Sequence, residues 1–163
     1  TCALPGVQLK WPNDLLYRGA KLGGILLEMA GDAAGSCQVV VGVGLNVAMP
    51  ASSAAPIDQQ WTDVARLARA IAAPRPHRNT LLAALLNEIL PLLNGFDAQG
   101  FAPWRERWQA LDAHAGKSVV MSSGQQRRAG IARGVNERGA LLLETTLGVE
   151  AVFGGEMTMR VNE

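Results

Sequence analysis

Two lysines, Lys10 and Lys21, occupy positions that arginine could fill if positive charge were the only requirement. The 163-residue chain has 15 basic side chains, and only three of them are lysines. Lysine is a compact point charge on a flexible stem, so it can follow a charge that moves as a reaction proceeds. Phosphoryl and adenylyl transfer have this requirement. The alternative interpretation is that both lysines are solvated ends of strands.

The residues between and after these lysines favour a shared anionic ligand. The stretch from Tyr17 to Lys21 predicts a hairpin connection, which lets the ammonium groups of Lys10 and Lys21 converge on one ligand. The pair Gly23-Gly24 then removes side chains at a place where a ligand can approach the backbone closely. The alternative is that this glycine pair is only a bulge.

A second cluster, GVGLN from Gly42 to Asn46, lies inside an apolar run. A strand interior does not favour Gly or Asn, so a closely approaching ligand is a reasonable cause of this pattern. The alternative is a strand that crosses under a helix. Val47 stands where a dinucleotide fingerprint needs its third glycine, and the sequence contains no Walker A motif. We therefore do not expect a Rossmann or P-loop nucleotide site.

Composition limits the class of protein. With 48% hydrophobic residues, the chain can bury roughly 70% of its unfolded surface, enough for one main domain and a small second one. A net charge of +1 offers no electrostatic footprint for a nucleic-acid backbone. No uninterrupted apolar run reaches the roughly 18 residues of a membrane span. We expect a soluble cytoplasmic protein in which Cys2 and Cys37 are reduced and structural.

The first part of the chain predicts strands and then helices. Short apolar runs separated by turn formers predict strands up to Met49, with Val39 to Val43 as a central strand covered on both faces. Three helices follow. The first is expected to be capped by Thr62 and to end at Pro74 and Pro76. The second is expected to be capped by Asn79 or Thr80 and kinked at Pro91. The third is expected near Pro103 to Leu111.

From His114 onward, short strands joined by glycine-containing turns predict a small barrel. The predicted fold class is therefore α+β: a mixed sheet with helices packed on it over residues 1–113, followed by a small β-barrel over residues 114–163.

These motifs, in this order, resemble the biotin protein ligase family. The matching segments are KWPND (10–14), KLGGILLE (21–28) and VGVGLNV (41–47). The segments GIARGVNERGALLLE (130–144) and GGEMTMR (154–160) are similar to the family's SH3-like C-terminal domain. The resemblance implies a catalytic core of the class II synthetase and biotin ligase type, of which this chain holds the C-terminal part.

The family implies an enzyme that uses ATP to convert biotin to biotinyl-5'-AMP. It then transfers biotin to a lysine of a biotin carboxyl-carrier protein. By resemblance, Lys21 is the catalytic residue that bridges the biotin carboxylate and the α-phosphate. Asp14 orients or deprotonates the incoming amine, or is simply a turn residue.

The resemblance also assigns binding roles. Lys10 and Asn13 face the ATP phosphates, and Asn46 meets the nucleotide or its Mg²⁺, whose ligands the sequence does not assign. Trp61 packs near the adenine or belongs to the core. The residues implied to line the biotin site are Gly23, Gly24, Ile25, Leu26, Gly42 and Gly44. Arg133 and Glu156 are interpreted as a surface pair, with the alternative that they reach the active site from the barrel. We give His77 and His114 no catalytic or metal role.

One departure from the family qualifies this assignment. The arginine- and glycine-rich loop that closes over biotin is expected before KWPND, together with the groups that hold the ureido ring, and this chain does not contain it. We expect the chain to be the later part of a longer protein, poorly active alone, with any DNA-binding domain outside it and homodimerisation possible. The alternatives are a lipoate ligase-like acyl-adenylate transferase, which KWPND and the GGE ending disfavour, and a non-catalytic binding or dimerisation module.

Overall fold

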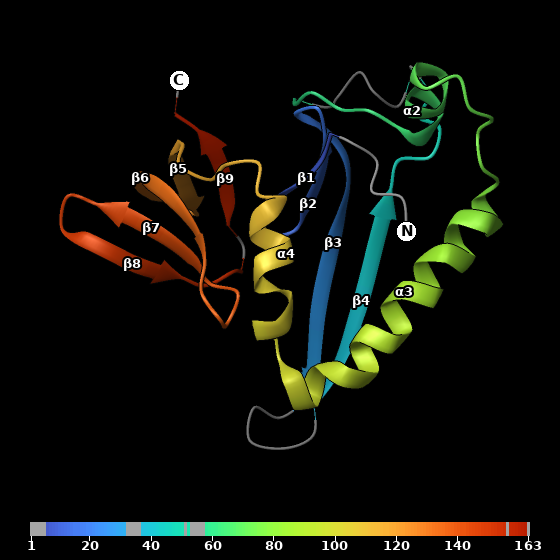
Figure 1. The fold of residues 1–163 in the computed structure, drawn as a ribbon. Coiled ribbons are helices and arrows are strands. Elements are labelled where there is room, and N and C mark those ends of the chain that lie inside the picture. The colour runs from blue at the N-terminus through green and yellow to red at the C-terminus, as the bar shows by residue number, and fades with distance from the viewer. Residues whose placement is uncertain (1–5, 32–36, 51, 53–57, 156, 163) are drawn as a thin grey trace. The chain divides into compact units, whose positions relative to one another are not determined.

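The computed structural model of the chain describes residues 6–31, 37–50, 52, 58–155 and 157–162. It divides into two compact units (Figure 1). The first unit comprises residues 1–8 and 13–75, and the second comprises residues 9–12 and 76–163. The predicted division between residues 113 and 114 stays a prediction.

A sheet in the order β1-β2-β3-β4 belongs to the first unit except for residues 9 and 10 at the end of β1, which belong to the second. Its strands are β1 (Val7–Lys10), β2 (Asp14–Tyr17), β3 (Ala20–Gly31) and β4 (Cys37–Leu45). The predicted hairpin is confirmed, because Tyr17 pairs with Ala20 and both intervening residues, Arg18 and Gly19, have the positive φ of a two-residue turn. The described β2–β3 and β3–β4 ladders are antiparallel, so the prediction of a mixed sheet is wrong for these strands.

The position of β4 differs from the expected central strand. Among the described strands β4 lies at the edge of its sheet, and Val39 and Val40 are 51% and 58% exposed. A continuous apolar run shows which surface a strand can bury favourably, but it does not show what covers that surface. Cys2 and the side chain of Cys37 lie outside the described residues, so the expectation for the cysteines is not addressed.

Helix α2 (Val64–Ala70) packs on the sheet of the first unit. Its Leu67 joins Tyr17 and Leu22 in a small buried cluster. The cap is Asp63 and not the expected Thr62, and the helix ends at Ala70, before Pro74. The carboxylate of Asp63 accepts from the backbone N–H of Arg66, as an N-cap should.

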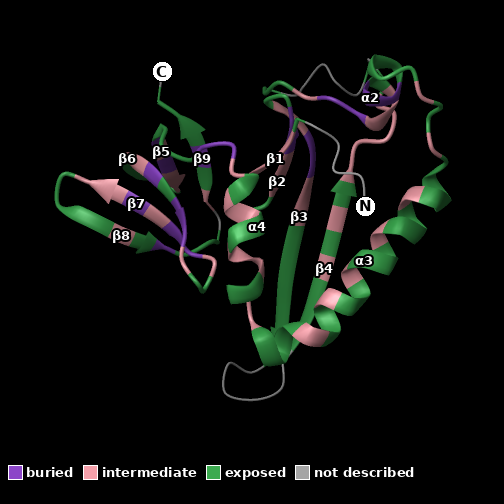
Figure 2. Ribbon diagram, in the orientation of Figure 1, coloured by how far each residue is buried: buried purple, intermediate pink, exposed green. Residues whose placement is uncertain are grey.

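The second unit begins with helices α3 (Arg78–Gln99), η1 (Ala102–Trp104) and α4 (Arg105–Ala110). The segment that was expected to form a third helix is confirmed as η1 and α4. Helix α3 starts after His77, which makes no side-chain cap, and it continues through Pro91 as one element. None of its residues is buried, as Figure 2 shows.

By length and composition, α3 qualifies as a candidate membrane span within the described residues, although the sequence analysis expected none. The sequence prediction asked for an uninterrupted apolar run. A membrane-spanning helix can include a few polar residues, so α3 meets the broader criterion. One such helix is weak evidence, since core helices of soluble proteins pass the same test.

A five-stranded antiparallel sheet completes the second unit, in the order β8-β7-β6-β5-β9. Its strands are β5 (Ser118–Ser123), β6 (Gln126–Val135), β7 (Leu141–Thr145), β8 (Gly148–Val152) and β9 (Thr158–Val161). Within the part of the chain that the structure describes, the two outer strands, β8 and β9, are not neighbours, so the predicted small barrel is not confirmed and no closed barrel is found. The number of short strands suggested a barrel, but closure depends on a ladder between the two outer strands, which this number does not specify.

The core of this unit is built from apolar residues of the five strands together with Trp11, which is 3% exposed. The indole Nε1 of Trp11 donates a hydrogen bond to the carbonyl of Gly139 at 3.1 Å. Leu9 is bonded to the segment after α4, through its N–H to Leu111 and its carbonyl to Ala113. Residues 9–12 are therefore held in the second unit by an aromatic anchor and two backbone bonds.

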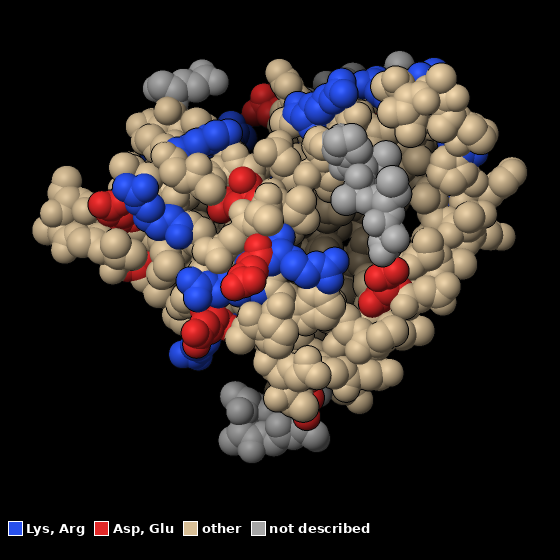
Figure 3. Space-filling model, in the orientation of Figure 1, with Lys and Arg blue, Asp and Glu red and all other residues tan. Residues whose placement is uncertain are grey.

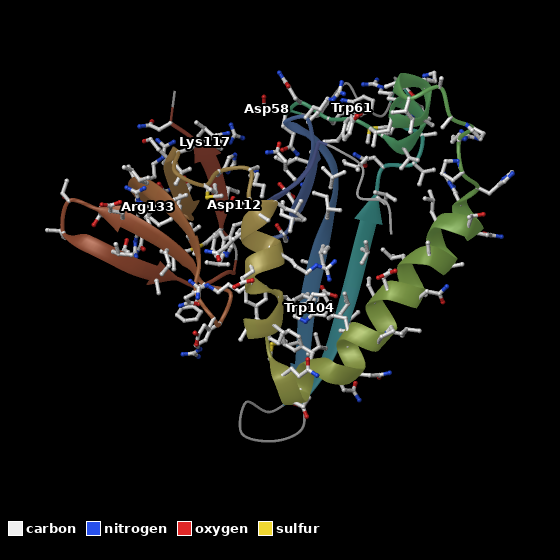
Figure 4. The ribbon with its side chains drawn as sticks, viewed as in Figure 1. Asp58, Trp61, Trp104, Asp112, Lys117 and Arg133 are labelled. Carbon is white, nitrogen blue, oxygen red and sulfur yellow. The ribbon has the colours of Figure 1, made fainter. Side chains whose placement is uncertain are left out.

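In this unit a half-buried carboxyl, Asp112, lies next to a buried imidazole, His114. Asp112 lies between α4 and β5 (Figure 4), and its Oδ1 accepts from the backbone N–H of His114 at 2.9 Å. Within the described residues, Asp112 Oδ2 and His114 Nδ1 are buried without hydrogen-bond partners. Burial raises the pKa of the Asp112 carboxyl. Burial also lowers the pKa of His114, and the nearby charges of Lys117 and Lys10 lower it further.

The lowered pKa of His114 predicts a loss of stability in mild acid. Below about pH 6.5 the unfolded chain binds more protons at this position than the folded chain, so stability falls as the pH drops toward the folded pKa. The raised pKa of Asp112 acts in the opposite direction, and comparing variants that all keep Asp112 cancels its contribution. We expect His114→Gln to reduce the loss in urea-unfolding free energy between about pH 7.5 and about pH 5.5.

The exposed His77 provides a matched control, because His77→Gln removes the same titrating group from the surface. This control should keep the acid sensitivity of the parent protein. Equal pH dependence in His114→Gln and the parent would contradict the prediction.

Candidate functional site

The two glycine-containing motifs meet at one open hollow of about 650 Å³ in the first unit. We call it the β3–β4 hollow. Its lining residues are Asn13, Asp14, Lys21, Gly23, Gly24, Ile25, Leu26, Gly42, Val43, Gly44, Leu45 and Asn46. All the predicted site residues except Lys10 and Trp61 are therefore brought together here. The volume is in the range of small-molecule sites.

The register of β3 and β4 explains how distant motifs meet. Gly24 pairs with Gly44, and Leu26 pairs with Gly42. Paired residues of an antiparallel ladder point to the same face of the sheet, so the two glycines of β4 lie opposite alternate residues of β3. The missing side chains leave backbone accessible on this face. An added Cβ at Gly42 or Gly44 would meet only ordinary van der Waals contacts, so packing does not require glycine at either position.

Lys21 and Asp14 form an ion pair at the hollow. The distance from Lys21 Nζ to Asp14 Oδ1 is 2.6 Å, and the two side chains are 31% and 13% exposed. Asp14 stands opposite Gly24 in the β2–β3 ladder. A Cβ at Gly24 would lie 3.3 Å from Asp14 Oδ1 and 3.7 Å from Lys21 Cε, so the absence of a side chain leaves room for the pair.

Asn46 is engaged by the protein through its amide nitrogen. Its Nδ2 donates to the carbonyl of Lys21 at 3.3 Å and to the carbonyl of Thr62 at 3.1 Å. Both bonds use Nδ2, so Oδ1 is the atom with which Asn46 can accept a hydrogen bond from a ligand. The side chain therefore has a structural role in addition to any binding role.

Lys10 and Trp61 do not line the hollow. Lys10 belongs to the second unit by its contacts. Trp61, on the segment that leads into α2 (Figure 4), lines a different depression together with Ala20 and residues 58–60. The Arg66 guanidinium carbon lies 3.9 Å from the centre of the Trp61 ring, a cation–π contact. Trp61 is still linked to the site through its backbone, because it forms a parallel bridge with Lys21.

Among the described residues, Asp14 and Lys21 are the charged side chains that line the hollow. Arg133, on β6, forms an exposed ion pair with Glu144 on β7, while Glu156 lies outside the described residues. On the face that Figure 3 shows, basic and acidic side chains lie in mixed groups.

The described residues contain no cluster of three or more His, Cys, Asp or Glu side chains that could hold a metal ion. Asp14 is the one carboxylate that lines the hollow, and it is paired with Lys21. The donor set is therefore not a protein cage for Mg²⁺. Such an ion would depend mainly on ligand phosphates and water, as is usual for nucleotide-bound Mg²⁺.

Comparison with known proteins helps to decide whether the hollow is a ligase-type site or part of a non-catalytic binding module. Residues 5–46, which include most of the β3–β4 hollow, match the Biotin/lipoate A/B protein ligase family. The chain is 36% identical to the bifunctional ligase/repressor BirA of Escherichia coli over 157 residues, covering 96% of this chain and 47% of that protein. It is 32% identical to the biotin--[acetyl-CoA-carboxylase] ligase of Paracoccus denitrificans, covering 90% of this chain and 63% of that protein.

Over most of its length the chain is similar to members of the biotin protein ligase family. It spans about half the length of the curated relatives BirA of Escherichia coli and of Salmonella typhimurium. The apo biotin protein ligase of Aquifex aeolicus has the same fold, with a TM-score of 0.78 at 24% identity, covering 96% of this chain and 66% of that one. This similarity makes an unrelated binding module the weaker interpretation of the hollow.

Sequence reasoning missed two contributors to this candidate site. Thr62 bonds to the backbone of Lys21, and the buried Asp63 holds the segment after β4 through Met49. An acidic residue directly before an apolar helix is an N-cap signal, so the sequence offers Asp63 as a cap beside Thr62. The bond to Met49 depends on the tertiary fold and has no local signal.

The glycine pair of this site supports a direct test of packing. A Cβ at Gly23 would collide with the backbone carbonyl of Gly44, whereas a Cβ at Gly44 would lie 3.8 Å from the carbonyl oxygen of Gly24. We expect Gly23→Ala to lower the unfolding free energy by about 1–3 kcal/mol, because the β3–β4 ladder must shift. Urea unfolding measures the effect.

Gly44→Ala is the matched control on the partner strand, with an expected change within about 1 kcal/mol. Equal destabilisation by the two substitutions would show that the close approach at Gly23 does not determine the cost.

Proposed function

We propose that the native protein containing this chain is a biotin ligase that activates biotin with ATP and transfers it to a lysine of an acceptor protein. The observation that carries this proposal is the position of Lys21. Its ammonium is paired with Asp14 in a hollow that is otherwise lined by glycines, aliphatic side chains and the amides of Asn13 and Asn46. Such a site combines one mobile positive charge with surfaces suited to a partly apolar ligand.

In the first half-reaction, an oxygen of the biotin carboxylate attacks the α-phosphorus of ATP. The bond between the α-phosphorus and the bridging oxygen of pyrophosphate breaks, and pyrophosphate leaves with the electron pair. Negative charge develops on the phosphoryl oxygens, and the Lys21 ammonium stabilises it. Because the ammonium has three donors, it can contact the phosphate while it keeps a bond to Asp14.

In the second half-reaction, the acceptor lysine amine attacks the acyl carbon of biotinyl-5'-AMP, and AMP leaves with the electron pair. The free amine has a reference pKa of roughly 10.4, so it is mostly protonated at neutral pH and must lose a proton to attack. We assign the orientation and deprotonation of this amine to Asp14. The carboxylate is mostly buried beside the Lys21 ammonium, and this position supports the assignment.

The remaining lining residues suit the two substrates. Ile25 and Leu26, with the open backbone at Gly42 and Gly44, offer an apolar surface for the aliphatic chain of biotin. The Oδ1 atom of Asn46 offers an acceptor for the nucleotide. From the family resemblance we also propose that Lys10 and Asn13 contact the ATP phosphates and that Trp61 packs near the adenine. Mg²⁺ neutralises triphosphate charge when it accompanies ATP, and we derive no step through it.

The proposed acceptor is a biotin carboxyl-carrier protein, and the proposed compartment is the cytoplasm. Support comes from relatives that are named biotin--[acetyl-CoA-carboxylase] ligase. Lipoate ligase activity is the second candidate, because the matched family includes both biotin and lipoate ligases. The names of the more similar full relatives favour biotin.

Replacing Lys21 tests the proposed chemistry. In the native protein, we expect Lys21→Ala to reduce biotinyl-5'-AMP formation at least ~100-fold, the scale of losing one preorganised charge contact. Lys21→Arg should not restore the rate, because a rigid guanidinium fork cannot follow the developing charge as an ammonium does. Labelled biotin with ATP, followed by separation of the adenylate, gives the rate.

Lys117→Ala is the matched control, because it removes an exposed ammonium from the second unit. Its rate should stay near that of the parent. If Lys21→Ala and Lys117→Ala form adenylate at the same rate, Lys21 has no catalytic role. Adenylate formation from labelled lipoate in place of biotin would identify lipoate ligase activity.

Replacing Asp14 separates the two half-reactions. We expect Asp14→Asn to slow transfer from preformed biotinyl-5'-AMP by about 100-fold, in the range typical of general acid–base catalysis. Adenylate formation should fall less, since the amide can still accept a hydrogen bond from Lys21. Mixing purified adenylate and acceptor with the variant measures transfer alone, and equal losses in both steps would restrict Asp14 to holding Lys21.

A further inference from the structure

Asp63 is buried to an unusual degree for a carboxylate. It is 3% exposed, and both of its oxygens accept hydrogen bonds from backbone N–H groups. Oδ1 accepts from Arg66 at 2.7 Å, which is the helix cap, and Oδ2 accepts from Met49 at 3.0 Å. A cap needs one acceptor, and serine would supply it. The second oxygen therefore serves a different purpose, which is to hold the segment that follows β4.

Further bonds join the same two segments. The N–H groups of Val64 and Ala65, at the start of α2, donate to the carbonyls of Asn46 and Val47 at 2.9 and 3.0 Å. The Asn46 side chain adds a bond to Thr62. We call this assembly of residues 46–49 and 62–65 the 46/63 corner.

The 46/63 corner holds the backbone of Lys21. Thr62 N–H donates to the Lys21 carbonyl at 2.8 Å, and Asn46 Nδ2 donates to the same oxygen at 3.3 Å. The Lys21 N–H donates to the carbonyl of Gln60 at 2.9 Å. The backbone N–H and the backbone carbonyl of Lys21 are thus both bonded to the segment that leads into α2.

This support matters because the other side of Lys21 is irregular. Lys21 pairs with Leu16 on β2, and the register of the β2–β3 ladder shifts between Leu15 and Leu16. A bulge locally disrupts a ladder and redirects side chains, so the hairpin alone defines the direction of Lys21 less strictly. The corner is the regular partner that fixes the lysine backbone.

We propose that Asp63 is a positioning residue for Lys21, acting through the 46/63 corner. The inference rests on the function proposed above, and it adds a residue that does not line the β3–β4 hollow. Asp63 locks residues 46–49 onto the start of α2. Thr62 and Asn46 transmit that constraint to the Lys21 carbonyl, which keeps the ammonium beside Asp14. Displacements of about 1 Å at a reacting group can cost on the order of 100-fold in rate, so the corner affects catalysis without touching substrate.

Asp63→Asn and Asp63→Ser test the proposal in the native protein. Both variants keep an acceptor for the Arg66 N–H, since Asn and Ser are good N-caps. Asn presents its amide nitrogen to the Met49 N–H, and Ser is too short to reach it, so both lose the second bond. We expect adenylate formation at saturating ATP and biotin to fall ten- to 100-fold in each variant. The exposed Asp97→Asn is the matched control, with an unchanged rate.

A double-mutant comparison separates positioning from general structural support. If Asp63 acts through Lys21, Asp63→Asn should change the residual rate of Lys21→Ala by less than about twofold, because residues that act as a unit are not additive. An equal fold loss in both backgrounds would overturn the proposal. A full Lys21→Ala effect with no Asp63→Asn effect would also overturn it while leaving the proposed function intact.

Amide hydrogen exchange provides a readout that does not depend on activity. The Thr62 N–H is bonded to the Lys21 carbonyl, so loosening the corner should speed its exchange at least tenfold in Asp63→Asn. Unchanged exchange at Thr62 would show that the constraint does not reach Lys21, whatever the rate of catalysis. If Lys21→Ala leaves adenylate formation unaffected, the proposed function fails, and the role of Asp63 in it fails as well.

Discussion

The ion pair between Lys21 and Asp14 is the interaction on which the rest of the site depends. The pair requires a tight hairpin that places Asp14 of β2 beside β3, and a missing side chain at Gly24 that leaves room for it. It also requires a fixed backbone at Lys21, which the bonds from Asn46 and Thr62 supply. Elements that never touch the ammonium thereby determine where it points. The short helix α2 contributes through its cap and its first turn, more than through the apolar surface that it buries.

Local patterns allowed the prediction of several features that depend on neighbouring residues. Turn formers between apolar runs located the Tyr17–Lys21 hairpin, and the glycine motifs identified most of the residues of the hollow. These motifs meet because β3 and β4 are consecutive antiparallel strands, so a simple hairpin-like order brings Gly24 opposite Gly44. The same reasoning assigned the cap of α2 to Thr62, one residue too early, because Thr and Asp are both good caps and the sequence alone does not choose between them.

What could not be predicted depends on tertiary pairing. Trp61 was grouped with the hollow by resemblance, and Lys10 by the predicted hairpin as well as by resemblance, but neither residue lines the hollow. The role of Trp11 as an anchor in the core of the second unit follows from a bond to Gly139, far away in sequence, which no local signal predicts. The open five-stranded sheet illustrates the same limit, since counting strands does not determine whether the outer strands pair. Sequence patterns therefore predict elements and their faces more reliably than their long-range partners.

The partial exposure of the Lys21–Asp14 pair is consistent with a residue that must exchange partners. Ion pairs at exposed positions contribute about 0–1 kcal/mol, because solvent screens the charges and ordering the side chains costs entropy. At 31% exposure, the Lys21 side chain is close to this limit, so a phosphate oxygen can take over one of its hydrogen bonds at little cost. A fully buried pair would resist such an exchange, since breaking it leaves an uncompensated charge. Hydrogen bonds fix the backbone of Lys21, whereas its ammonium is held only by a partly exposed ion pair. The ammonium therefore starts from a defined position and can still follow a charge that moves during the reaction.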